Sequence, residues 1–235
     1  VMNTDNMSIL GLTIDYGPYG WLEDYNPVWT PNTTDAHTRR YCFGNQPKIA
    51  QWNLAQLANS IYPLVGDAQP LQDAVNRFWE TFEHQYQDMM ARKLGFHAFD
   101  TESHSQLIKE LLELIALVEI DYTLFFRNLA RIDITGFSRN DVDIEQLSQP
   151  LSEAFYQPDT HTGGFSDQFH RWLDNYAGQI VRDDRDPEIR QSEMNRTNPR
   201  YVLRNYLAHQ AIEKAENNDF SMIHELMDVM RHPYD

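Results

Sequence analysis

The chain has 235 residues, of which 41% are hydrophobic, and its formal net charge is −16. That length suits one large domain or two small ones, and the composition is typical of a globular protein and excludes an intrinsically disordered one. A surface this acidic repels phosphate backbones and anionic lipids, so nucleic acid and membrane surfaces are excluded as expected partners.

The first 47 residues are rich in glycine, proline and polar turn formers. Met7–Ile14 is short, apolar and partly β-branched, which predicts a strand or a tight hairpin between two polar turns. Asp15–Pro18 predicts a turn, and residues 18–47 predict an extended, aromatic-rich loop of a length that is uncommon unless functional. Because the chain opens without a leader or start-like sequence, we expect it to be part of a longer protein.

From Lys48 onward, apolar residues recur at helical spacing, and the aromatic stripes among them are expected to be core. The predicted helices are Lys48 to near Pro63, Leu71–Met89 with Pro70 in the first turn, Leu107–Val118, Tyr122–Leu129 with Asp121 as N-cap, Phe165–Tyr176, a helix that starts at Asn198-Pro199 and runs to about Glu216, and Ile223–Met230. A weak boundary is expected at Ile134–Ser138. The pattern therefore predicts a mainly α chain with a short β hairpin near the N-terminus, divided into residues 1–47 and a helical part, 48–235.

Asp5, Asn6 and Asp15 are the residues most suited to chemistry. Magnesium takes oxygen ligands in a near-octahedral shell, and an Asn amide oxygen and an Asp carboxylate on neighbouring turns meet that need. Asp5 adds a carboxylate that can accept a proton from an attacking hydroxyl. The alternative is that these residues only shape turns, which Asp and Asn commonly do.

The other polar candidates indicate structure more than chemistry. The histidines show no zinc-binding spacing, and His97 and His104 are expected to be solvated in a loop. Cys42 is the only cysteine, so no disulfide can form within the chain; a small apolar role and a reducing compartment are expected, either the bacterial cytoplasm or, for a eukaryotic protein, the mitochondrion.

Two further groups have open alternatives. The arginine pairs Arg39-Arg40 and Arg200 with Arg204 either form ordinary salt bridges or, for the first pair, support the loop after Asp15 or face a substrate. The loop aromatics either hold the loop closed or contact a protein substrate; they are Tyr19, Trp21, Tyr25 and Trp29.

Protein kinases combine an Asp and an Asn on a catalytic loop with a following Asp-Phe-Gly. Here Asp15-Tyr16-Gly17 stands where Asp-Phe-Gly would be. The sequence departs from the kinase pattern because Asp5 and Asn6 are adjacent, whereas kinases place the Asn five residues after the Asp.

Four stretches resemble the selenoprotein O family, and together they span the chain. They are Asn3–Pro18, Arg39–Pro47, Asn198–Leu207 and Arg231–Asp235. The resemblance implies a protein-kinase-like fold, of which this chain would be part of the C-lobe with additional helices. It also implies transfer of AMP from ATP to Ser, Thr or Tyr hydroxyls of proteins.

By that resemblance, Asn6 and Asp15 match the metal ligands, and Asp15 is also a nucleotide-binding residue. Asp5 matches the proton acceptor. The implied cofactor is Mg²⁺, with Mn²⁺ as an alternative; ATP is a substrate, and proteins bearing hydroxyls are the acceptors. The family's phosphate-gripping residues and its C-terminal Cys or selenocysteine have no counterpart here, so the chain alone is expected to be inactive. The alternatives are a non-catalytic helical interaction domain and a kinase-type phosphotransferase.

Overall fold

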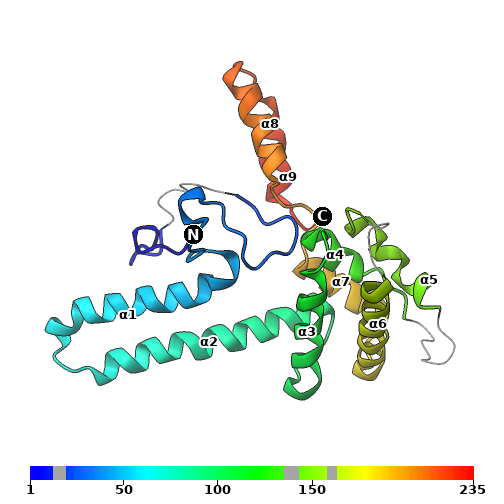
Figure 1. The fold of residues 1–235 in the computed structure, drawn as a ribbon, viewed down its shortest axis with the longest axis horizontal. Coiled ribbons are helices and arrows are strands. Elements are labelled where there is room, and N and C mark those ends of the chain that lie inside the picture. Colours follow the sequence, from blue (N-terminus) through cyan, green and yellow to red (C-terminus); the bar gives the residue numbers. More distant parts are fainter. Residues whose placement is uncertain (13–19, 135–142, 158–162) are drawn as a thin grey trace. The chain divides into compact units, whose positions relative to one another are not determined.

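The structure is a computed structural model that describes residues 1–12, 20–134, 143–157 and 163–235. Within these ranges the chain is mainly helical (Figure 1). The α-helices are α1 (Gln46–Val65), α2 (Gln69–Leu94), α3 (Thr101–Ile115), α4 (Tyr122–Leu129), α5 (Ile144–Ser148), α6 (Gly163–Asp183), α7 (Pro187–Thr197), α8 (Asn205–Glu216) and α9 (Ser221–Arg231). Short 3-10 helices lie at η1 (Thr4–Asn6), η2 (Thr33–Asp35), η3 (Phe43–Asn45) and η4 (Gln149–Ala154).

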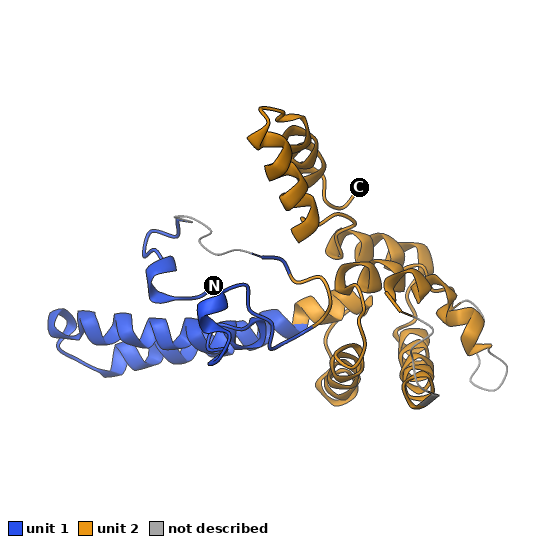
Figure 2. Cartoon of the chain, turned by 45° about the horizontal axis from the view of Figure 1, so that its top comes forward, with its two compact units in different colours: residues 1–21, 26–87 blue, residues 22–25, 88–235 orange. Residues whose placement is uncertain are grey.

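The described residues divide into two compact units (Figure 2). Unit 1 contains residues 1–21 and 26–87, and unit 2 contains residues 22–25 and 88–235. Helix α2 contributes residues to both. No described helix combines the length and the apolar character that crossing a membrane requires.

Unit 2 holds the hydrophobic core. Helix α3 packs on α6, and α4 packs on η4. Phe125, Leu129, Trp172 and Tyr176 are at most 2% exposed. The polar atoms of the buried rings are satisfied, since Trp172 Nε1 donates to Leu107 O at 2.9 Å and Tyr176 Oη to Leu94 O at 2.8 Å. The predicted core role of the aromatic stripes in α4 and α6 is therefore confirmed.

The apolar stripe of α2 is different. Leu71, Val75, Phe78 and Phe82 are only half-buried, and Met89 is 41% exposed. The α2 aromatics instead stack along their own helix, for example Phe78 on Phe82 with ring centroids 6.3 Å apart. The prediction that aromatic stripes are core was wrong here, because helical periodicity shows which side of a helix is apolar but not whether another element covers it.

Several helix boundaries agree with the predicted ones, and others differ from them. Asp121 caps α4, with Oδ1 accepting from Leu124 N at 2.8 Å, as predicted. Helix α1 continues past Pro63 to Val65, and its C-cap is Gly66, whose φ of +72° suits a residue without Cβ. Asn198 does not start a helix: it is the C-cap of α7, and α8 begins only at Asn205. Helices α5, η4 and α7 were not predicted.

The predicted hairpin at residues 7–14 is also wrong over its described part, 7–12, where no strand forms. The chain turns there instead: Gly11 N donates to Ser8 O at 3.0 Å, and Gly11 has a φ of +69°. Ile9 and Leu10 are 83% and 76% exposed. A strand needs a partner for its backbone groups, and an apolar, β-branched run cannot supply one by itself. The expected boundary at Ile134–Ser138 lies almost entirely outside the described residues.

Candidate catalytic segment

Asp5 and Asn6 lie on η1, which is a single 3-10 turn. Asn6 N donates to Asn3 O at 3.0 Å, and Met7 N donates to Thr4 O at 3.3 Å. Both side chains are exposed. Asn6 Nδ2 donates to Val1 O at 2.8 Å, so the Oδ1 atom of that amide is left to accept a ligand.

The third predicted residue, Asp15, lies outside the described residues, as does Tyr19. The geometry that would join Asp15 to Asn6 is therefore not part of the described structure. Within the described ranges, His, Cys, Asp and Glu side chains form no group of three that could hold a metal ion.

Helix α1 holds the segment that carries Asp5 and Asn6. Met2 N donates to Gln46 Oε1 at 2.7 Å, and Asn53 Nδ2 donates to Met2 O at 3.0 Å. Sequence reasoning missed both amide residues. A signal was present for Asn53, which follows Ile49 and Ala50 at i+4 and i+3: a polar residue on the buried face of a helix usually has a specific partner.

A groove of about 530 Å³ runs between this segment and α1. Thr4 and Met7, which flank Asp5 and Asn6 in the sequence, line it together with residues of α1. Its walls combine apolar side chains such as Ile9 and Leu57 with hydroxyl and amide groups. A mixed lining of this kind can hold a ligand that has both an apolar body and polar groups.

The loop that follows is organised by the buried carboxylate of Asp35. Its oxygens accept from Thr38 Oγ1 at 2.6 Å, Arg40 N at 2.9 Å and Tyr41 N at 2.7 Å. Burial alone would raise the pKa of Asp35, but these hydrogen bonds and the Arg40 charge outweigh it and lower the pKa below its ordinary value. Asp35 therefore stays ionised and fixes the turn in which Arg39 has a φ of +49°.

The arginines and aromatics of the loop take several roles. The Arg40 guanidinium lies 4.8 Å from the Trp52 ring centroid, a cation–π contact. Tyr25 stacks on Tyr122 with centroids 5.3 Å apart, which supports an intramolecular anchor for that residue. Cys42 is 4% exposed, so its predicted role as a small buried residue is confirmed. His104 was expected to be solvated, but it is buried against Phe96.

In unit 2, the stretches 198–207 and 231–235 are in direct contact. The backbone nitrogens of Arg200 and Tyr201 both donate to Pro233 O, at 2.7 and 3.0 Å. Lys93 and Asn198 exchange two hydrogen bonds of 2.9 Å each. Burial lowers the pKa of the Lys93 amine to about 8. These two stretches therefore build the junction that holds the α8–α9 hairpin.

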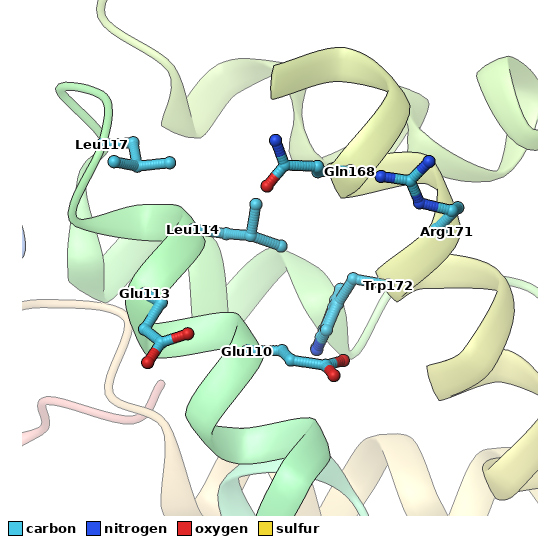
Figure 3. Close-up of a pocket in the computed structure, with 7 residues that line it drawn as sticks. All are labelled: Glu110, Glu113, Leu114, Leu117, Gln168, Arg171 and Trp172. Carbon is cyan, nitrogen blue, oxygen red and sulfur yellow. The ribbon is translucent and has the colours of Figure 1, made fainter. Parts of the chain in front are cut away.

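A second groove, of about 410 Å³, lies between α3 and α6 (Figure 3). Glu110 and Glu113 line it from α3, and Gln168 and Arg171 line it from α6. The two carboxylates already interact along their own helix, Glu110 with Gln106 and Glu113 with Lys109. This groove follows from the packing of α3 on α6, and it holds none of the predicted site residues.

Comparison with known proteins gives one consistent result. The family model described as "Protein adenylyltransferase SelO" matches residues 1–231. Curated relatives named "Protein nucleotidyltransferase YdiU" are 48% identical in Rhodopirellula baltica, 50% in Xanthomonas axonopodis pv. citri and 43% in Flavobacterium johnsoniae. Each match covers 100% of this chain but only 43–44% of the relative, so the chain spans less than half the length of these relatives.

Proposed function

The chain belongs to the SelO family of protein adenylyltransferases, and from this premise we propose that it is the C-terminal part of an enzyme that transfers AMP from ATP to Ser, Thr or Tyr hydroxyls of proteins. The observation that carries the proposal is the match over the whole chain to proteins named nucleotidyltransferases, together with the exposed Asp5-Asn6 pair at the start of the matched region.

Asn6 and Asp15 are assigned as metal ligands, and Asp15 is also assigned as a nucleotide-binding residue. Asn6 fits a hard cation because its amide nitrogen is engaged with Val1 O, which leaves the oxygen as the available ligand atom. Bound Mg²⁺, or Mn²⁺ in its place, would neutralise phosphate charge as pyrophosphate leaves.

Asp5 is assigned the role of proton acceptor for the attacking hydroxyl of the acceptor protein. Its carboxylate is exposed beside Asn6, so it can orient that hydroxyl and take its proton. Base assistance is expected to contribute less than positioning and charge neutralisation, because a loose phosphoryl-type transition state needs little help from a base.

The helical body is proposed to be part of a kinase-like C-lobe, with residues 1–47 as its catalytic and metal-binding portion. Since the chain spans less than half the length of the relatives, the reaction is expected to need the rest of the protein, and this chain alone is expected to be inactive. The alternatives are a non-catalytic helical interaction domain, in which the same residues only shape turns, and a kinase-type phosphotransferase.

The test incubates the full-length protein and an acceptor protein with ATP and measures the mass added to the acceptor. An AMP increment supports the proposal, a phosphate increment supports the phosphotransferase, and no increment supports the interaction domain. Asp15→Ala is expected to lower transfer by at least about 100-fold, because one charge-stabilising ligand is lost. Its thermal unfolding should be unchanged.

Asp67→Ala is the matched control. Asp67 shapes the turn between α1 and α2, where its carboxylate accepts from Gln69 N at 2.9 Å. If Asp15→Ala affects transfer no more than Asp67→Ala does, the metal assignment is wrong and Asp15 is a turn residue.

A further inference from the structure

Two amide side chains of α1 bind both polar backbone groups of one residue, Met2. Gln46 Oε1 accepts from Met2 N at 2.7 Å, and Asn53 Nδ2 donates to Met2 O at 3.0 Å. Gln46 and Asn53 are seven residues apart, about two helical turns, so both point to the same side of α1. Together they replace the pair of hydrogen bonds that a neighbouring strand would otherwise give to Met2.

Each amide also makes a further contact, and we call Gln46 and Asn53 with their contacts to the segment 2–7 the clamp. Asn53 Nδ2 lies 2.8 Å from Met7 Sδ. Met7 follows η1 in the sequence, whereas Met2 precedes it. Gln46 Nε2 donates to Tyr41 O at 2.6 Å and to Cys42 O at 3.1 Å, where the preceding loop joins α1. The helix therefore holds η1 at both flanks and connects it to the loop that follows the candidate site.

The burial of Asn53 shows that the amide is specifically placed. The residue is 6% exposed, and its Oδ1 has no hydrogen-bond partner among the described residues. A buried acceptor without a partner lowers stability, and a leucine of similar size would avoid that cost. The favourable interactions of this amide are therefore those of its nitrogen with the segment 2–7.

Asp5 and Asn6 depend on such support. Both are exposed, and the contacts within their own segment are a single 3-10 turn and the bond from Asn6 to Val1 O. A single turn of this kind has little stability of its own. The direction of the two side chains is therefore set by how the flanking backbone is held.

We propose that Gln46 and Asn53 are positioning residues, which hold the segment 2–7 on α1 so that Asp5 and Asn6 are presented in a fixed arrangement. The proposal deepens the proposed function and rests on it for its catalytic part. The structural part, that these amides order the segment 2–7, can be measured separately.

The first measurement is amide hydrogen exchange in the full-length protein with Asn53→Asp, which keeps the size of the side chain but replaces its donor with a second acceptor facing Met2 O. Exchange of the amides of residues 2–7 is expected to accelerate by more than about tenfold, while α1 keeps its protection. Asn59→Asp is the matched control, because Asn59 is exposed on the same helix, and it should leave both regions unchanged. Unchanged exchange at residues 2–7 in Asn53→Asp would overturn the proposal.

The second measurement is the steady-state rate of AMP transfer. Asn53→Asp is expected to lower kcat by about 100-fold with little change in KM for ATP, since a displacement of about 1 Å at a catalytic group has that effect. Gln46→Met tests the other amide and should lower kcat in the same way if α1 stays folded. Accelerated exchange with an unchanged kcat in both variants would overturn the positioning role. Absence of AMP transfer in the unmodified protein would instead reject the proposed function, with the exchange result still deciding whether the clamp exists.

Discussion

His104 illustrates at the residue scale how burial changes the chemistry of a side chain. It is 7% exposed, its ring centroid lies 3.8 Å from that of Phe96, and its Nδ1 accepts from Asp100 N at 3.0 Å. Burial lowers the pKa of the imidazole, and the nearby carboxylates of Asp100 and Asp183 oppose the shift only partly. The folded protein therefore favours the neutral ring, which the accepted hydrogen bond also requires.

This lowered pKa predicts a pH-dependent stability. The unfolded chain protonates His104 at a higher pH than the folded chain does, so unfolding takes up a proton in the range between the two pKa values. The contribution of neutral His104 to the free energy of unfolding is fully present above the pKa of the unfolded chain, about 6.5. It is lost as the pH falls through that value toward the pKa of the folded protein. His104→Gln keeps an acceptor but cannot titrate, so its thermal midpoint should fall less than that of the parent between about pH 7.5 and 5.5.

The control for this measurement is His37→Gln, which removes an exposed histidine and so tests whether burial is the cause of the pH slope. If His104→Gln has the same pH slope as the parent protein, then His104 does not contribute a lowered pKa to stability.

At the element scale, Asp121 joins segments that are distant in the sequence. One oxygen caps α4 through Leu124 N, and the other accepts from Tyr156 Oη at 3.0 Å and pairs with Arg204 at 2.7 Å. Arg204 directly precedes α8, and Tyr156 follows η4. Burial, together with the negative charge of Asp121, raises the pKa of Tyr156 to about 12, so Tyr156 remains a donor.

Asp121→Asn is expected to lower the free energy of unfolding by about 3 kcal/mol, because it leaves the Arg204 guanidinium largely buried without its carboxylate. Chemical denaturation monitored by tryptophan fluorescence measures the change. Combining it with Arg204→Met should recover part of the loss, since the unpaired charge is then removed. The exposed pair Arg131–Glu153 is the control: Arg131→Met should cost less than about 1 kcal/mol. Equal losses at the two pairs would show that burial of Arg204 does not matter.

At the scale of the whole molecule, burial differs sharply between the two units. Among the described residues of unit 1, the buried ones are Asp35, Cys42, Ile49, Ala50 and Asn53, whereas unit 2 contains the continuous core of α3, α4 and α6. Several large side chains of α1 and α2 remain exposed, including Trp52, Tyr62 and Trp79. Since helix stability in proteins comes mainly from tertiary packing, unit 1 has less to stabilise it.

Hydrogen exchange of this chain by mass spectrometry should therefore separate the two units. We expect peptides from α1 and from residues 69–87 to exchange at least about tenfold faster than peptides from α3 and α6. Residues 88–94 serve as an internal control, because they continue α2 but include Met90 and Leu94, which are fully buried in unit 2. Uniform protection along the whole of α2 would contradict this prediction.

The sequence by itself determined the family and most helices of the core. Long, specific stretches carry the family resemblance, and periodicity with a capping aspartate predicted α4 to its boundaries, because such signals depend on residues close in the chain. The pair Asp5 and Asn6 was singled out in the same way, as neighbours in one short segment, and its role stays a prediction.

Only the tertiary structure decided which of these elements are covered and what they contact. It replaced the predicted strand at residues 7–12 with a turn, left the α2 stripe half-exposed, buried His104, and brought Asn53 to Met2, 51 residues away in the sequence. Strand pairing, burial and the partners of buried polar groups depend on residues distant in the chain, and a local pattern contains no information about which distant residues will meet.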